Sequence, residues 1–190
     1  MAAYRGRSTW SLEGEELRPE IFWIRDIEPL RFGIMGRPRA GEWLADEIAS
    51  WRSIGVSTVV SLLQPSEVTE LELGREPDLC ASQDIEFISF GVDDRGTPER
   101  ATEFLALSAT IAAKVRGGAA VAAHCRAGIG RSGLFAACVL RELGIPAADA
   151  FELLTRARGA AVPDTPDQIA WFAAHRKNSA SPSNYRLGRP

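Results

Sequence analysis

The sequence predicts an α/β fold built from one layered domain. Short apolar runs rich in β-branched residues alternate with helix-like segments as far as residue 124, and the chain from residue 131 onward has a wholly helical pattern. Such alternation is typical of sheets whose strands are joined by helices. With 190 residues, of which 45% are hydrophobic, the chain is long enough to bury one good core.

Each element follows from a local pattern. We expect strands where apolar runs are bounded by turn residues, near 21–25, 31–35, 57–63, 85–90 and 119–123. We expect helices near 41–54, 65–74, 98–116, 131–143, 146–157 and 165–177. The domain is therefore expected to span residues 20–177, between an N-terminal extension over 1–19 and a flexible tail, rich in Ser, Pro and Gly, over 178–190.

Composition excludes several classes of function. A net charge of -3 and a pI near 5.5 provide no broad basic field, so we expect no nucleic-acid partner. No apolar stretch approaches the roughly 20 residues of a membrane helix, so no membrane insertion is expected. The first residues lack an apolar signal core, which favours a cytoplasmic location. Three widely spaced cysteines argue against a disulfide framework and against a paired-thiolate zinc site.

The most informative segment runs from Ala119 to Gly133. It reads as a buried strand, a short glycine-bearing loop and the start of an apolar helix. Unpaired backbone N–H groups converge at such a turn and the helix dipole adds partial positive charge, so an anion is stabilised there. Gly128 and Gly130 would let the backbone curl around phosphate oxygens. We therefore expect the backbone of residues 126–131, called the phosphate loop below, to bind phosphate.

Three side chains at this loop are suited to react with a bound phosphate. Five residues separate Cys125 from Arg131, which places a sulfur at the base of the loop and a guanidinium on its rim. Arginine can donate two parallel hydrogen bonds to a phosphate. The same positive surroundings would lower the pKa of Cys125, and the thiolate is the nucleophile. Ser132 could donate its hydroxyl to the sulfur when a phosphocysteine breaks down.

Other interpretations of the loop fit less well. Gly128, Gly130 and Gly133 also satisfy the dinucleotide-binding pattern G-x-G-x-x-G, but a helix rather than a second parallel strand is expected about 20 residues later. A nucleoside triphosphate loop needs Gly-Lys-Ser/Thr, but here Arg131 precedes Ser132 and no lysine is nearby. A buried free cysteine in a core is the remaining alternative, and we keep it for Cys80 and Cys138.

If the thiolate attacks a phosphate ester, breaking the P–O bond leaves an alkoxide or phenoxide, so a carboxylic acid should protonate that oxygen. The expected strand 85–90 is followed by the loop Gly91 to Pro98, called the acid loop below, which contains Asp93 and Asp94. Such a loop can move over a neighbouring site. Turn formation and helix capping are the structural alternative for these carboxylates.

The segment His124 to Ser132, with His-Cys, five residues, Arg and Ser, resembles the signature of the protein tyrosine phosphatase superfamily. The strand 55–63 followed by Pro65-Ser-Glu-Val is similar to the compact dual-specificity phosphatases, and the segments 94–98 and 158–168 are most similar to the kinase-associated phosphatase subgroup. The resemblance implies a central, mostly parallel sheet flanked by helices, a phosphocysteine intermediate, and no metal or other cofactor.

The resemblance also implies roles for individual residues. Asp94 matches the family's acid, with Val92 two positions before it and Pro98 four positions after it, whereas Asp93 is the alternative; Gly91 stands where many relatives have proline. Gln168 would position water, although it also suits the first turn of a helix that begins at Thr165. The expected catalytic residues are thus Cys125, Arg131, Asp94, Ser132 and Gln168. The expected substrate-binding residues are His124, Arg126, Ala127, Gly128, Ile129, Gly130 and Arg131.

The resemblance implies a phosphatase that acts on phosphorylated proteins or peptides at phosphotyrosine. Larger tyrosine-specific members of the family carry an extra loop that deepens the pocket, and no equivalent is found in this sequence, so phosphoserine and phosphothreonine stay open as further substrates. Two alternatives stay open. A phosphoinositide or small-molecule phosphatase would use the same loop, and its usual loop lysines are represented here only by Arg126. A phosphate-binding module without hydrolysis is the other alternative, although such modules lack the cysteine or the acid.

Overall fold

A five-stranded sheet forms the centre of the molecule, whose computed structural model describes residues 20–175. The expected N-terminal extension, the end of the helix predicted over 165–177 and the C-terminal tail lie outside these residues. The strand order is β1-β2-β5-β3-β4; β1 is antiparallel to β2 and the other pairs are parallel. The strands are β1 (Phe22–Trp23), β2 (Arg31–Met35), β3 (Thr58–Ser61), β4 (Glu86–Ser89) and β5 (Ala120–His124). The predicted α/β class is confirmed.

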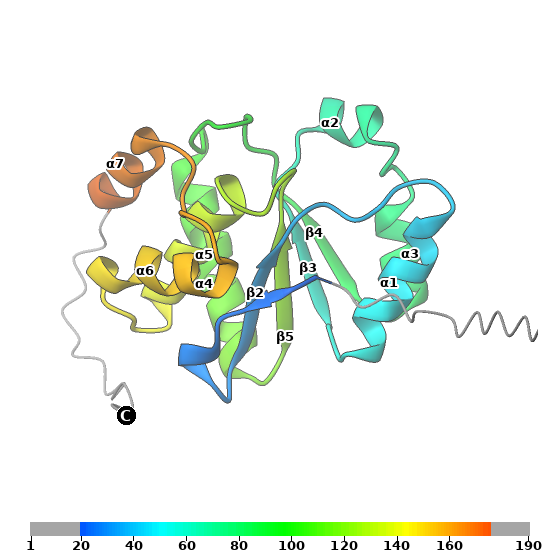
Figure 1. Ribbon diagram of the computed structural model, residues 1–190, viewed down its shortest axis with the longest axis horizontal. Helices are drawn as coiled ribbons and strands as arrows, with labels where there is room; N and C mark the ends of the chain where they lie inside the picture. The colour runs from blue at the N-terminus through cyan, green and yellow to red at the C-terminus, as the bar shows by residue number, and fades with distance from the viewer. Residues whose placement is uncertain (1–19, 176–190) are drawn as a thin grey trace, which may run out of the picture.

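Helices cover both faces of this sheet (Figure 1). α4 and α5 lie on one face, with α6 and α7 beside α5, and α1 and α3 lie on the other. The helices are α1 (Trp43–Ser53), α2 (Pro65–Glu70), α3 (Glu76–Ser82), α4 (Ala101–Arg116), α5 (Arg131–Glu142), α6 (Ala147–Arg158) and α7 (Pro166–Ala174), with a 3-10 turn η1 over Arg25–Ile27. None of the helices within residues 20–175 has the length and apolar character needed to cross a membrane.

The central strands are buried on both faces, as parallel strands between two helical layers must be. In β3, Val60 packs into the core beneath α4 and α5, whereas Val59 packs into the core beneath α1 and α3. In β5, Val121 and Ala123 belong to the first of these cores and Ala122 to the second. The alternation follows the two-residue period of a strand. Two apolar layers therefore hold β3 and β5 in place, and both strands end beside the expected site.

The helix predicted over 65–74 is wrong in its second half. α2 ends at Glu70, Glu72 takes a left-handed φ of 55°, and the chain turns before α3 starts at Glu76. α3 was not predicted, because it is short and contains Pro77, which suits only the first turn of a helix. The break turns α2 toward the carboxyl edge of the sheet and leaves α3 packed on its face (Figure 1). The other predicted elements match within a few residues.

Candidate active site

The candidate site lies at the carboxyl edge of the parallel strands. β5 ends at His124, Cys125 follows, and α5 begins at Arg131. The acid loop after β4, helix α2 after β3 and the segment that leads into α7 reach the same edge (Figure 1). Ligand sites of open α/β sheets typically form here, because loops from several strands meet.

Two glycines shape the phosphate loop for different reasons. Gly128 has a left-handed φ of 71°, and a Cβ there would lie 2.5 Å from the carbonyl carbon of Met35. Gly130 has a φ of -75°, which any residue can adopt, but a Cβ there would lie 3.0 Å from Cβ of Asp164 and 3.2 Å from the amide of Gln168. The expected tight curl thus depends on Gly128, and Gly130 is small because neighbouring side chains approach it.

The carbonyl groups of the phosphate loop are held by partners outside it. The carbonyl of Arg126 accepts a hydrogen bond from the backbone N–H of Arg37 at 3.3 Å. The carbonyl of Ala127 accepts one from Nη2 of Arg158, also at 3.3 Å. Within residues 20–175, no backbone N–H from Arg126 to Arg131 donates a hydrogen bond. The loop therefore keeps a set of free backbone donors, as an anion site requires.

Arg158 contacts both the phosphate loop and the first strand. Besides its bond to the carbonyl of Ala127, its guanidinium lies 4.1 Å from the ring centroid of Phe22 in β1. Such a stacked contact is a favourable cation–π geometry. Arg158 is thus a support of the phosphate loop and of β1.

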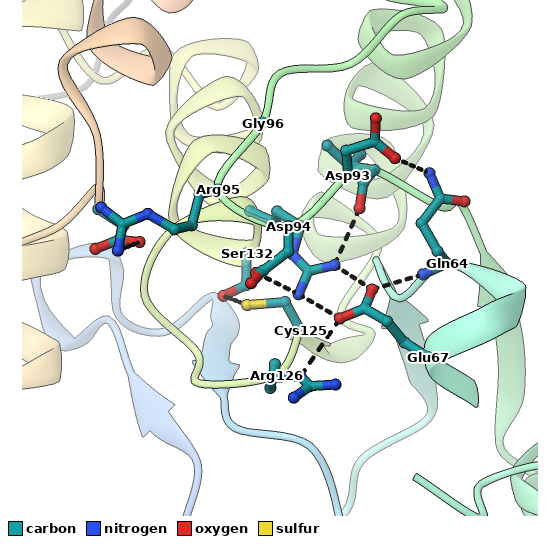
Figure 2. Close-up of polar contacts among 12 residues, drawn as sticks. Gln64, Glu67, Asp93, Asp94, Arg95, Gly96, Cys125, Arg126 and Ser132 are labelled. Atoms are coloured by element: carbon teal, nitrogen blue, oxygen red, sulfur yellow. Dashed lines mark hydrogen bonds and ion pairs between the residues drawn. The ribbon is translucent and has the colours of Figure 1, made fainter. Parts of the chain in front are cut away.

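Cys125 and Ser132 are close to one another beneath the loop. The sulfur of Cys125 lies 3.3 Å from Oγ of Ser132, within hydrogen-bonding distance for sulfur, and both residues are buried. Figure 2 shows the two side chains facing one another across the loop. A hydroxyl in this position can donate to a thiolate, as expected from the sequence.

Arg131 is buried, and both Nη atoms of its guanidinium donate hydrogen bonds. Its guanidinium donates to both carboxylate oxygens of Glu67, at 2.5 and 2.9 Å, and to the carbonyl of Val92 at 3.0 Å. A further bond of 2.9 Å joins Nη2 to Oδ1 of Asp94. Burial alone would lower the pKa of Arg131, but the hydrogen bonds and charge of Glu67, together with Cys125 and Asp94, raise it. Arg131 is a permanent cation in this site.

Glu67 is the functional residue that sequence reasoning missed. It stands in the first turn of α2, where its carboxylate also accepts a hydrogen bond from the backbone N–H of Gln64 at 3.0 Å (Figure 2). Burial would raise the pKa of Glu67, but the bonds to Arg131 and Gln64 outweigh it and the pKa is lowered. A signal was available: an acidic residue at the third position of a helix that starts with proline directly after a buried strand is a capping pattern.

The two candidate acids point in different directions. Oδ1 of Asp94 contacts Arg131, and its side chain is 60% exposed. Oδ1 of Asp93 instead accepts a hydrogen bond of 2.8 Å from Nε2 of Gln64 on the flank of the site (Figure 2). At Gly91 a Cβ would lie 2.6 Å from Oε1 of Gln64, so a larger residue there would displace the end of the Gln64 side chain. The structure thus brings Asp94 to the arginine and Asp93 to a supporting contact.

Gln168 lies between the phosphate loop and the acid loop. Its backbone N–H bonds to Oγ1 of Thr165 at 3.3 Å, the capping contact expected at the start of a helix. Its side chain does more: Nε2 donates to the carbonyl of Gly96 at 2.9 Å and the amide lies against Gly130. Oε1 is buried, with no hydrogen-bond partner among residues 20–175. This oxygen is available to a water at the phosphate loop.

The rim beside the phosphate loop is acidic. Arg126 bonds to Glu70 of α2 at 2.8 Å and lies 3.5 Å from Glu67. The hydrogen bond and charge of Glu70 raise the pKa of Arg126. A hollow of about 390 Å³ adjoins this pair, and carboxylates of α2 and of the acid loop line it; its lining residues are Gln64, Ser66, Glu67, Glu70, Asp93, Asp94 and Arg126. We call this space the rim hollow.

The remaining cysteines and His124 are buried. Burial raises the pKa of both Cys80 and Cys138 to about 12, so both remain neutral thiols in the core. The side chain of His124 is also fully buried, with Nε2 3.0 Å from Oε1 of Glu76. The expected substrate-binding role of His124 can therefore involve only its backbone. Residues 20–175 contain no group of three or more His, Cys, Asp or Glu suited to hold a metal ion.

Comparison with protein families gives one match over most of the chain. A family model described as "Swiss Army Knife protein, DSP-PTPase phosphatase domain" matches residues 22–184. No curated protein sequence is similar enough to count as a relative. The assignment of this chain to a family by its sequence therefore rests on the family model.

Solved structures share the fold. Kinase-associated phosphatase, with its catalytic-site cysteine replaced by serine, superposes with a TM-score of 0.74 at 20% identity over 83% of this chain and 94% of that one. Tk-PTP in its active form gives 0.65 at 25% identity, over 82% and 95% of the two chains. PTPMT1 gives 0.63 at 18% identity, over 80% and 91%. The expected likeness to compact dual-specificity phosphatases, and to the kinase-associated subgroup among them, is confirmed.

Proposed function

Because the chain belongs to the DSP-PTPase phosphatase domain family of Swiss Army Knife proteins, we propose that it hydrolyses phosphomonoesters on proteins through a phosphocysteine intermediate on Cys125. One observation carries the proposal. The sulfur of Cys125 lies beside a loop whose backbone donors are free within the described residues, next to a buried arginine that Glu67 holds in place. Backbone donors and a fixed guanidinium together stabilise a phosphate and the charge that develops on it during transfer.

Binding of the phosphate comes first. The N–H groups of residues 126–131 donate to its oxygens, and Arg131 supplies a further donor. One N–H of Nη2 is bonded to Asp94, so the phosphate takes this donor over and Asp94 is released toward the leaving group. Glu67 keeps its own two bonds and fixes the plane of the guanidinium meanwhile.

Transfer follows. The Cys125 thiolate attacks phosphorus, the bond from phosphorus to the ester oxygen breaks, and its electron pair goes to that oxygen. Asp94 in its protonated form gives this oxygen a proton, so the product leaves as a neutral alcohol or phenol. The Asp94 side chain is exposed at the mouth of the site, where a leaving group departs.

Hydrolysis of the phosphocysteine completes the cycle. Water attacks phosphorus, Asp94 accepts its proton, and the sulfur leaves as a thiolate that receives a hydrogen bond from Ser132 at the observed 3.3 Å. Gln168 orients the water through Oε1, its buried oxygen without a hydrogen-bond partner among residues 20–175.

A phosphorylated protein or peptide suits the rim better than a lipid headgroup with several phosphates. Glu70 pairs with Arg126 at 2.8 Å, and Arg126 is the only basic residue among positions 126–130. The carboxylates of the rim hollow repel a second phosphate placed there. PTPMT1, which shares the fold at 17% identity, has been solved in complex with PI(5)P, and a phosphoinositide is therefore one arm of the test.

The decisive experiment compares Cys125→Ser with Cys138→Ser, since Cys138 is a buried cysteine of the same domain in α5. With an aryl phosphate as substrate, Cys125→Ser should abolish turnover while still binding inorganic phosphate, and Cys138→Ser should remain active. Turnover by Cys125→Ser would overturn the mechanism. Rates of the wild type on phosphotyrosine, phosphothreonine, phosphoinositide and sugar phosphate then identify the substrate class, and a preference for the phosphoinositide would overturn the proposed one.

A further inference from the structure

A buried pair of ionisable side chains lies directly behind the nucleophile. His124, the last residue of β5, is 0% exposed, and Glu76, the first residue of α3, is 1% exposed. Their atoms Nε2 and Oε1 are 3.0 Å apart. Within residues 20–175, these two atoms and Nδ1 of His124 make no hydrogen bond of good geometry. The 3.0 Å approach is therefore a close polar contact between the two side chains.

Such a pair is costly in a protein core. Removing a carboxylate and an imidazole from water is unfavourable, and a well-packed apolar pair of similar volume is often more stable. The surroundings here are apolar: Met35, Leu63 and Leu73 belong to the same core between the sheet and α1 and α3. The pair is thus not explained by stability, and its position next to Cys125 suggests a role in the site.

The pair connects α3 to the start of the phosphate loop. The carbonyl of His124 accepts a hydrogen bond from the backbone N–H of Leu62, so the peptide that leads into Cys125 is fixed on one side by β3. On the other side, the imidazole lies against the carboxylate of Glu76, with Nε2 and Oε1 3.0 Å apart. A carboxylate beside one ring nitrogen fixes both the orientation of the ring and the nitrogen that carries the proton.

We propose that Glu76 is a positioning residue of the phosphatase site: by holding the imidazole of His124 it sets the position of Cys125 and of the first peptide of the phosphate loop. This inference rests on the proposed function, and it assigns a role to a residue of α3, which makes no contact with substrate. The transfer step is the one proposed above, and Glu76 takes no direct part in it, because it acts only through His124.

The test uses Glu76→Gln, which removes the carboxylate and keeps its volume, with Cys80→Ala as the matched control. Cys80 is buried one helical turn further along α3 and stands in the same core. For the full chain, kcat, KM, inhibition by inorganic phosphate and the rate of Cys125 carboxymethylation by iodoacetate are measured, together with the melting temperature. The melting temperature identifies losses that come only from a weakened core.

We expect Glu76→Gln to lower kcat about 10- to 100-fold, the range of a lost supporting contact or a misplacement near 1 Å, to slow carboxymethylation of Cys125, and to weaken inhibition by inorganic phosphate by a smaller factor, because only the first peptide of the phosphate loop is displaced. Cys80→Ala should keep the wild-type kcat even where its melting temperature falls as far. Equal losses of kcat in both variants, or a wild-type kcat in Glu76→Gln, would overturn the inference.

A double-mutant cycle covers the case in which Glu76→Gln folds poorly. If Glu76 acts through His124, the variant Glu76→Gln/His124→Asn should lose no more kcat than His124→Asn alone, because residues that act as a unit are not additive. Additive losses would contradict the inference. Failure of the proposed function is recognised separately, because it would appear as turnover by Cys125→Ser, whatever the result at Glu76.

Discussion

Glu67 and Arg131 form a two-point pair, in which both carboxylate oxygens accept hydrogen bonds from the guanidinium, at 2.5 and 2.9 Å. The carbonyl of Val92 receives a third bond from the same group. Arg131 is therefore held in one orientation before any substrate arrives. A donor fixed in advance need not be reorganised during the reaction, which is how active sites obtain most of their electrostatic stabilisation.

Substituting Glu67→Gln should therefore impair catalysis as well as stability. The amide offers one acceptor where two are needed and turns an N–H group toward the guanidinium, so Arg131 is misplaced. We expect kcat/KM to fall by about 100-fold and the free energy of unfolding to fall by about 3 kcal/mol, the order found when a buried pair loses one partner. Steady-state kinetics and urea denaturation measure the two effects. Glu103→Gln, which breaks an exposed pair with Arg100, is the control and should leave both nearly unchanged.

The stability contributed by Glu67 should depend on pH in one direction. Its pKa is lowered from 4.5 in the folded protein, so the contribution is complete well above pH 4.5 and is lost as the pH falls through the folded pKa. The difference in unfolding free energy between the wild type and Glu67→Gln should thus shrink as the pH is lowered below 4.5. A difference that grows on acidification would contradict the assigned pairing.

Asp94→Ala and Asp93→Ala should separate the roles of the two neighbouring carboxylates. Loss of the acid slows turnover by about 10²- to 10⁴-fold, most for substrates with poor leaving groups, and we expect this only for Asp94→Ala. The same variant frees an N–H of Arg131, so inorganic phosphate should bind more tightly. Asp93→Ala removes the contact with Gln64. It should change the turnover rate by the same factor for substrates with good and with poor leaving groups. A larger, leaving-group-dependent loss in Asp93→Ala would reverse the assignment.

Glu70→Gln should change substrate preference at the rim. The substitution releases Arg126 from its partner at 2.8 Å and removes a negative charge beside the rim hollow. Activity on a phosphoinositide, relative to a phosphotyrosine peptide, should rise by about tenfold, the lower range of electrostatic focusing in clefts. Arg100→Gln breaks an exposed pair with Glu103 and should leave the ratio unchanged. An unchanged ratio in Glu70→Gln would show that the rim does not select against polyanions.

Alkylation should distinguish Cys125 from the two other cysteines. Burial raises the pKa of Cys80 and Cys138 to about 12, so below pH 9 both remain buried thiols, whereas only the thiolate reacts. Limited iodoacetamide treatment of the folded protein should modify Cys125 alone and abolish turnover in proportion, and inorganic phosphate should slow the reaction. Mass spectrometry of the digested protein checks this. Early labelling at Cys138 would contradict the described core.

The fold and the centre of the site could be predicted because they rest on local signals. The strand-loop-helix segment 119–133 contains its own turn residues, and its neighbours in sequence are its neighbours in space. The break between α2 and α3 was missed because a left-handed Glu72 leaves no mark in the apolar pattern. Where a backbone takes an unusual conformation at an ordinary residue, periodicity gives no warning.

Long-range partners were the part that sequence reasoning could not provide. The partner of Arg131 is Glu67, far away in the chain, and that of His124 is Glu76. Both acidic residues stand in the first turn of a helix. A carboxylate is common there because it interacts favourably with the helix dipole, so neither residue stands out in the sequence. Only the parallel order β5-β3-β4 brings those helix starts beside the phosphate loop. The sequence analysis could propose Asp94 and Gln168 because it relied on the family resemblance. In that family the fold already brings the corresponding positions to the phosphate loop.

The bond between Nε2 of Gln168 and the carbonyl of Gly96 has a consequence for the second half of the reaction. It joins the amide to the segment that contains Asp94, so in the proposed mechanism the two groups that accept hydrogen bonds from the attacking water belong to one connected unit. The backbone of that segment then sets the spacing of both groups. Under that mechanism, hydrolysis of the phosphocysteine would need this bond in place when the water attacks.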